Sequence, residues 1–143
     1  MQVFIIGTPL ETAHALDARR LNKQIIEAQQ ILDAAIGFTI AWAHHPCVQQ
    51  YKWNTVWLNA YKLTLYYYQQ DAKVLAAFWN SQAEAYRPDF HTPEYFDQMK
   101  RRLYTKDPNH YAQWAHLGTS EVNWYFVDGE WRHYRNGKLI KSK

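Results

Sequence analysis

The chain has 143 residues, of which 48% are hydrophobic and 20% charged, with a formal net charge of +3 at pH 7. This length and balance exclude a disordered chain and predict one globular domain over residues 1–143. No apolar run approaches the ~18 residues of a membrane span, and the N-terminus lacks a secretory signal. A single cysteine, Cys47, excludes an intrachain disulfide, so we expect a cytoplasmic protein without a membrane partner.

The first part of the chain is predicted to be helical after a short start. Residues 1–10 read as an extended, buried segment. Gly37 ends the first helix, and His45–Pro46 marks a break after an apolar stretch. The second helix has apolar residues on more than one side, which is typical of a central helix. Three helices are therefore expected, over about residues 11–36, 47–70 and 71–86.

The second part begins with another helix and ends in strands. Thr92 is a candidate N-cap and Pro93 fits the first turn of a helix that runs to about residue 104. A turn or short helix follows from Asp107 to Trp114. Asp-Gly at 128–129 and Asn-Gly at 136–137 predict two hairpins. The predicted fold is mainly α, a compact helical bundle over residues 11–115 with a small C-terminal antiparallel β-meander over 122–141.

The helix around residues 16–32 has two distinct faces. Leu21, Ile25, Ala28 and Leu32 form an apolar stripe at about 100° per residue. A neighbouring face about 140° wide collects the polar side chains. These are Asp17, Arg20, Lys23, Gln24, Glu27 and Gln30. Such a cluster can bind an anion through its cations while Glu27 acts as a general acid or base. The alternative is a solvated, salt-bridged face, because Lys23 and Glu27 are i,i+4 partners.

The aromatic content is high, with seven Trp, eleven Tyr and six Phe. Some of these rings are expected to line a groove where nucleobases stack. The candidates are Tyr51, Trp53 and Trp57. The alternative is that the rings form an aromatic-rich core with ordinary interface rings.

Other candidate groups are weaker. His44 and His45 are adjacent, which is unfavourable for joint metal ligation from a helix, so no metal and no cofactor are expected. Cys47 is expected to be a small buried hydrophobe. Basic residues in the second half either bind phosphates or form a solvated tail. They are Arg101, Arg102, Lys106, Arg132, Arg135, Lys138 and Lys141.

Several of these residues occur together in a known pattern. The pattern is Leu16-Asp17-x-x-Arg20-Leu21-x-Lys23-Gln24-x-x-Glu27-x-x-Gln30-Ile31-Leu32, followed by His45-Pro46 and an aromatic-rich helix. In this order of residues the chain resembles the pyrimidine-dimer DNA glycosylase superfamily. The resemblance is closest to its uncharacterised bacterial and phage branches. It covers residues 1–70 well and 100–114 weakly, through Lys106-Asp107-Pro108-x-His110-Tyr111, and does not include the β-meander.

The resemblance implies a mostly helical fold and a particular chemistry. In characterised members an N-terminal amine attacks the sugar C1′ of a damaged nucleotide, a covalent imine forms, a helix Glu assists, and the strand is cleaved. The family exposes its amine by removing the initiator Met before a small residue. Gln2 is bulky, so here the amine is expected to belong to Met1. When the helix starts are matched, the catalytic Glu of the family falls nearer Asn22 than Glu27, so Glu27 is expected to be the acid or base from the pattern of this chain. The expected ligand and phosphate contacts are Asp17, Arg20, Lys23, Gln24, His45 and Lys106.

Two function hypotheses remain open. The first is a DNA-repair-like protein that recognises a damaged or flipped nucleotide. The second is a non-catalytic nucleotide-binding protein that sequesters a free or cyclic signalling nucleotide, as a phage anti-defence factor would. The modest net charge of +3 favours the second over long-duplex binding. A purely structural interaction protein and a homo-oligomer are also compatible with the aromatic content.

Overall fold

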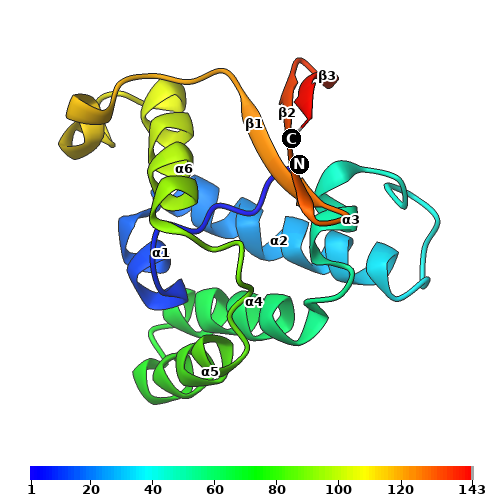
Figure 1. Ribbon diagram of the computed structural model, residues 1–143. Helices are drawn as coiled ribbons and strands as arrows, with labels where there is room; N and C mark the ends of the chain where they lie inside the picture. The colour runs from blue at the N-terminus through cyan, green and yellow to red at the C-terminus, as the bar shows by residue number, and fades with distance from the viewer. Residues whose placement is uncertain (143) are drawn as a thin grey trace. The chain divides into compact units, whose positions relative to one another are not determined.

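The computed structural model describes residues 1–142. Its elements confirm the predicted class: six α-helices and a short 3₁₀ helix precede a small antiparallel sheet at the C-terminus of the described chain (Figure 1). Backbone contacts divide the chain into two compact units, Met1–Pro88 and Asp89–Lys143, and each is described by itself. Within residues 1–142, no helix is long and apolar enough to cross a membrane.

The expected helix over residues 11–36 is two helices, α1 (Pro9–Ala15) and α2 (Ala18–Ala35). The Thr8 side chain and Glu11 form a capping box that starts α1. Leu16 is extended, and the Asp17 side chain accepts a hydrogen bond from the Arg20 amide and caps α2. The prediction of one continuous helix was wrong because both caps are strong start signals only nine residues apart.

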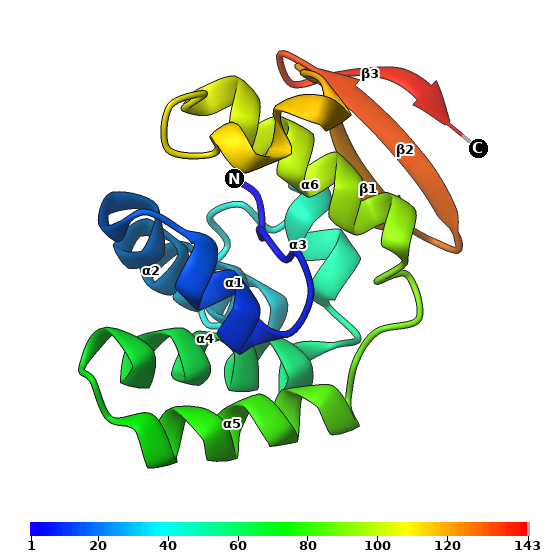
Figure 2. The ribbon, with the colours of Figure 1, turned by 90° about the vertical axis from the view of Figure 1, so that its left-hand side faces the viewer.

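The expected helix over residues 47–70 is also interrupted. α3 (Pro46–Tyr51) and α4 (Thr55–Gln69) are separated by a turn in which the Asn54 amide donates to the Tyr51 carbonyl. The following helix, α5 (Lys73–Ala85), matches its prediction within two residues. α4 is central, since it contacts α1, α2 and α5, and α5 lies antiparallel beside it (Figure 2).

The core of the N-terminal unit is a stack of rings surrounded by aliphatic side chains. Trp57 lies between Tyr51 and Tyr61, with ring centroids 5.4 and 5.0 Å apart and nearly parallel planes. All three side chains are fully buried. Burial of these three large rings stabilises the unit.

The C-terminal unit contains α6 (Pro93–Lys106), the 3₁₀ helix η1 (Ala112–Leu117) and the strands β1 (Asn123–Val127), β2 (Glu130–Arg135) and β3 (Lys138–Ser142). The antiparallel sheet has the order β1-β2-β3. Both hairpin turns have positive φ at both central residues, 52° and 77° at Asp128–Gly129 and 51° and 76° at Asn136–Gly137. These are the turns that the Asp-Gly and Asn-Gly signals predict. The Thr92 cap of α6 is confirmed as well.

Candidate functional site

The N-terminal segment is fixed along α2 by one buried amide. The Gln24 side chain is 3% exposed; its Nε2 donates to the Gln2 carbonyl at 2.7 Å and its Oε1 accepts from the Phe4 amide at 2.9 Å. The Tyr61 hydroxyl also donates to this oxygen, at 2.6 Å. Residues 2–4 therefore run beside α2 as extended chain (Figure 1). This attachment sets the position of Met1 without any strand pairing.

The charge of the Met1 amino group affects two side chains at the start of α3. Burial, and then the positive charge of the Met1 amino group, lowers the pKa of the His45 imidazole below its ordinary value of 6.5. The same amino group also lowers the pKa of the Cys47 thiol, although burial dominates there.

Cys47 connects Glu27 to the same cluster. Burial raises the pKa of its thiol to about 12, against lowering by the Met1 amino group and the Val3 backbone, and the Glu27 charge raises it further. The thiol is fully buried and stays protonated, so it is not a nucleophile. The Met1 amino group and the Glu27 carboxylate therefore have opposite effects on the pKa of this thiol.

Glu27 is a half-buried carboxylate at the edge of the core face of α2. Its side chain is 14% exposed and its Oε1 is 3.8 Å from the Lys23 Nζ, whose side chain is 71% exposed. This long ion pair with a solvated lysine is weak. Most of the Lys23 side chain is therefore in contact with solvent.

His45 also has a structural role. It is the N-cap of α3, and its Nδ1 accepts a hydrogen bond from the Cys47 amide at 3.0 Å. An accepting Nδ1 requires the neutral ring, which agrees with the lowered pKa of His45.

Arg20 and Asp17 are tied to each other. The Arg20 Nη1 donates to the Asp17 Oδ1 at 3.2 Å, and both side chains are about one-fifth exposed. Asp17 was expected to contact a ligand, but in the structure it caps α2 and anchors the guanidinium. Gln24, also an expected ligand contact, is occupied by the backbone of the N-terminal segment. Lys106 is exposed at the end of α6 and belongs to the C-terminal unit.

Two of the three predicted base-stacking residues are buried and the third is exposed. Tyr51 and Trp57 are fully buried in the core stack, so neither presents a ring face to a base, and these two predictions were wrong. The aromatic-core alternative holds for them. Trp53 is 85% exposed in the turn between α3 and α4, with the Lys52 Nζ 5.6 Å from its ring centroid. It therefore remains a stacking candidate.

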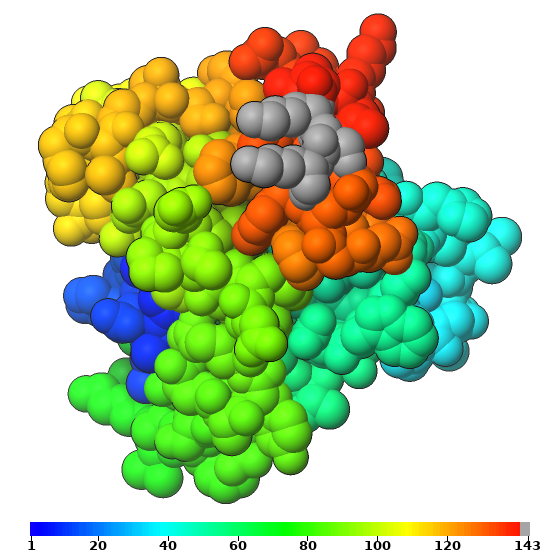
Figure 3. Space-filling model, in the orientation of Figure 1, coloured from blue at the N-terminus to red at the C-terminus, as the bar shows by residue number. Residues whose placement is uncertain are grey.

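An exposed apolar loop beside the cluster was not predicted as functional. Between α2 and α3 the exposed fractions are 68% for Ile36, 81% for Phe38, 93% for Ile40 and 54% for Trp42. The loop lies at the outer edge of the space-filling view, in cyan (Figure 3). Trp42 has a positive φ of 66° and packs edge-on against His45, with centroids 5.9 Å apart. The missed signal is the absence of charge over residues 34–43.

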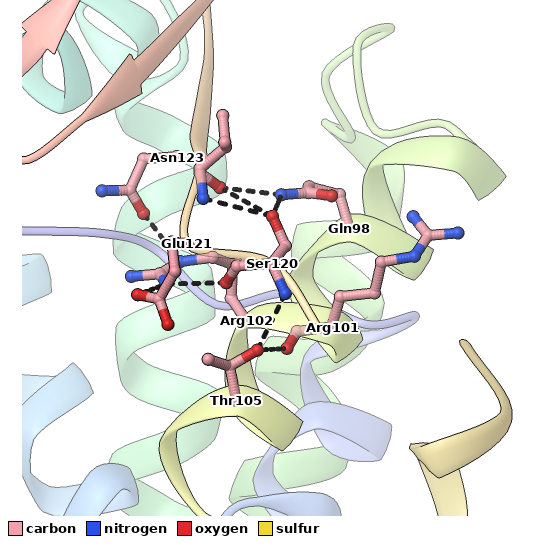
Figure 4. A network of polar contacts seen from close by, with 8 residues as sticks. Gln98, Arg101, Arg102, Thr105, Ser120, Glu121 and Asn123 are labelled. Atoms are coloured by element: carbon pink, nitrogen blue, oxygen red, sulfur yellow. Dashed lines mark hydrogen bonds and ion pairs between the residues drawn. The ribbon is translucent and has the colours of Figure 1, made fainter. Parts of the chain in front are cut away.

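Two of the basic residues proposed to bind phosphate hold the C-terminal unit together instead. The Arg101 Nε donates to the Leu117 carbonyl at 2.9 Å. The Arg102 guanidinium donates to Asn123 Oδ1 at 3.0 Å and to the Ser120 carbonyl at 2.9 Å (Figure 4). These bonds fix the segment before β1 onto α6. Within residues 1–142, no group of three His, Cys, Asp or Glu side chains is arranged to hold a metal ion.

Residues 1–68, just under half of the chain, match the family model of the pyrimidine dimer DNA glycosylases. The resemblance expected from the motif in α2 is therefore confirmed over this part of the chain. The matched segment contains Met1, Arg20, Lys23, Glu27 and His45, and ends within α4. No curated protein and no solved structure matches the chain.

Proposed function

We propose, from the similarity of residues 1–68 to the pyrimidine dimer DNA glycosylases, that this protein recognises a damaged or flipped nucleotide in DNA and reacts with its sugar. The Met1 amino group is the nucleophile and Glu27 is the assisting carboxylate. The observation that carries the proposal is that the matched segment contains both groups, with the Glu27 side chain only 14% exposed and weakly paired with Lys23. The segment that begins at Met1 is fixed by the bond from the Gln24 amide to the Gln2 carbonyl.

The reaction requires a neutral amine and a nearby carboxylate. The amine nitrogen forms a bond to C1′, the bond from C1′ to the base nitrogen breaks, and the base leaves with the electron pair. The Glu27 carboxylate stabilises positive charge that develops on the sugar and accepts the proton that the amine loses. Opening of the sugar ring then gives an imine, and elimination breaks the strand at the 3′ side.

The polar face of α2 supplies the phosphate contacts in this proposal. Lys23 is exposed and only weakly paired, and Arg20 is held in place by Asp17. A guanidinium that is already oriented loses less side-chain freedom when it binds a phosphate. These two cations lie on the same face of α2 as Glu27, one turn apart, which suits a phosphate beside the reacting sugar.

The apolar loop favours DNA over a free nucleotide. A pocket that sequesters a free nucleotide has no use for four large apolar side chains on a projecting loop. A protein that extracts a nucleotide from a duplex uses such side chains to separate stacked base pairs. Trp42, through its contact with His45, places this loop beside the amine.

Borohydride trapping tests the proposal. Purified protein that begins at Met1 is incubated with duplexes that carry a pyrimidine dimer or an abasic site, and the reduced protein–DNA adduct is quantified. We expect a trapped adduct with the unsubstituted protein and a loss of about 100-fold in its rate of formation in Glu27→Gln, since positioned acid–base groups contribute about 10²–10⁴-fold. Glu94→Gln, an exposed residue in the first turn of α6, is the matched control and should react normally.

Absence of an adduct with either duplex, together with a large thermal shift on addition of one mononucleotide or cyclic nucleotide, would contradict the proposal. It would support the sequestering function instead. Equal adduct formation by Glu27→Gln and the unsubstituted protein would remove Glu27 from the mechanism.

The loop has its own test. We expect the double substitution Phe38→Ser and Ile40→Ser to slow trapping on a pyrimidine-dimer duplex by about 10-fold or more, because unstacking costs a few kcal/mol per base step. Trapping on a single-stranded abasic oligonucleotide, which needs no unstacking, should be unchanged. Val74→Ser, at an 84% exposed position on α5, controls for the loss of surface hydrophobicity. Equal slowing on both substrates would contradict a role in duplex opening.

A further inference from the structure

One face of the sheet in the C-terminal unit carries four half-buried rings, two at each end. Side chains alternate along a strand, so Trp124 and Phe126 of β1 share a face with Trp131 and His133 of β2. At the Asp128–Gly129 end this face is covered by aromatic packing. Phe126 stacks on Phe90 at 5.5 Å, and Trp131 meets Tyr95 at 5.2 Å. At the other end the face is left half-exposed.

The half-exposed end carries two stacked rings. Trp124 and His133 are directly opposite each other in the β1–β2 register, with ring centroids 4.7 Å apart and planes inclined by 8°. Both side chains are half-buried. A ring pair stacked this flatly presents an aromatic surface of the kind that receives an unpaired base.

The same face continues into two positive charges. Arg135 follows His133 by two residues, and Lys138 is directly opposite Arg135 in the β2–β3 register. Both side chains are exposed. Like charges directly opposite each other on a sheet are destabilising unless an anion lies between them.

Three carboxylates lie near these charges. Glu121 lines the same surface hollow as Arg135, and its Oε2 is 3.8 Å from the Arg102 Nη1. Arg132, on the opposite face of β2, pairs with Glu130 at 3.1 Å and with Asp128 at 3.5 Å. Among the side chains that the structure describes, no carboxylate pairs with Arg135 or Lys138. The segment 130–143 contains five basic residues and one acidic residue, so it carries a net positive charge.

We propose that this face of the sheet binds a single-stranded stretch of DNA, with Arg135 and Lys138 on backbone phosphates and a base stacked on Trp124. The combination of adjacent cations and an aromatic surface is what single-stranded nucleic acid requires. The face lies outside residues 1–68, the part similar to the glycosylases, so it is a second contact with DNA in addition to the reacting site. The choice of DNA rests on the proposed function.

The test measures equilibrium binding of a fluorescein-labelled 15-residue oligothymidine to the full chain between about 50 and 200 mM salt. We expect the double variant Arg135→Gln with Lys138→Gln to bind at least tenfold more weakly at the lower salt. Its log–log salt dependence should be shallower by about 1.4, which is 0.7 for each lost phosphate contact. Lys73→Gln, an exposed lysine on α5, is the matched charge control and should bind normally.

The stacking part of the proposal is tested separately. We expect Trp124→Ala to weaken binding about tenfold and Trp124→Phe, which keeps a ring, to bind within about threefold of the unsubstituted protein. Unchanged binding by the double variant or by Trp124→Ala would overturn the proposal. So would equal weakening by Trp124→Ala and Trp124→Phe, or tighter binding to a duplex of the same length than to the single strand.

This experiment uses no lesion and no borohydride. A protein that forms no trapped adduct can still bind the oligothymidine through the sheet. Conversely, a protein that forms the adduct normally can fail to bind the oligothymidine. Failure of the proposed function and failure of the sheet proposal are therefore distinguishable.

Discussion

The role of Gln24 in the structure differs from the role that the sequence predicts. On the helical wheel it belongs to the polar face with Arg20 and Glu27, which made it a candidate ligand contact. In the structure it is buried with Ile31 on the core side of α2, because the extended N-terminal segment offers its amide a carbonyl and an N–H to bind. The single sequence does not reveal this, since the partner atoms are backbone atoms about 20 residues away.

We expect Gln24→Ala to destabilise the protein by about 2–3 kcal/mol, because it leaves buried polar groups of Gln2 and Phe4 without their partner. Gln30→Ala, one exposed turn away on the same helix, should cost less than about 0.5 kcal/mol. Urea unfolding measures both values. Gln24→Ala should also slow adduct formation, because the segment that positions Met1 is no longer fixed. Equal stability of the two variants would show that Gln24 does not hold the segment.

At the scale of elements, the sequence predicted whether a segment is helix or strand better than it predicted where the helices are interrupted. The hairpins and the start of α6 were predicted correctly because Asp-Gly, Asn-Gly and Thr-Pro act locally. The breaks at Asp17 and at residues 52–54 were missed because apolar periodicity continues through both. The exposed loop after α2 was not recognised as functional, since an apolar stretch reads as core unless the fold shows that nothing covers it.

The cap of α3 gives the protein a pH dependence that can be predicted in sign. The folded state lowers the pKa of His45 below 6.5, the value of the unfolded chain, so the unfolded state binds the proton more readily. The stability that neutral His45 contributes is therefore complete above pH 6.5 and is lost as the pH falls through the folded-state pKa. Protonation also removes the acceptor of the Cys47 amide.

We expect the free energy of unfolding to fall more steeply between pH 7 and pH 5 in the unsubstituted protein than in His45→Asn. Asparagine retains an N-cap acceptor but does not titrate. Thermal unfolding at several pH values measures the difference between the two proteins, which cancels the titration of other groups. Parallel pH profiles would show that His45 is not responsible.

At the scale of the whole molecule, the two units differ in what the sequence revealed. The α2 motif and the family similarity lie in residues 1–68, and the prediction of a mainly helical fold with a C-terminal meander is confirmed. The single domain over residues 1–143 and the roles of Met1, Glu27, Arg20 and Lys23 stay predictions. How Met1, Glu27 and His45 lie relative to one another depends on where an extended segment with no regular structure lies, which the sequence alone does not reveal.

The most direct test of the central claim is the position of the covalent bond in the trapped adduct. Protein that begins at Met1 is reduced with borohydride in the presence of the dimer-containing duplex, digested, and analysed by mass spectrometry. The proposed mechanism predicts that the sugar remnant is on the α-amino group of the peptide that starts at Met1. A remnant on a lysine side chain such as Lys23, or no remnant at all, would contradict it.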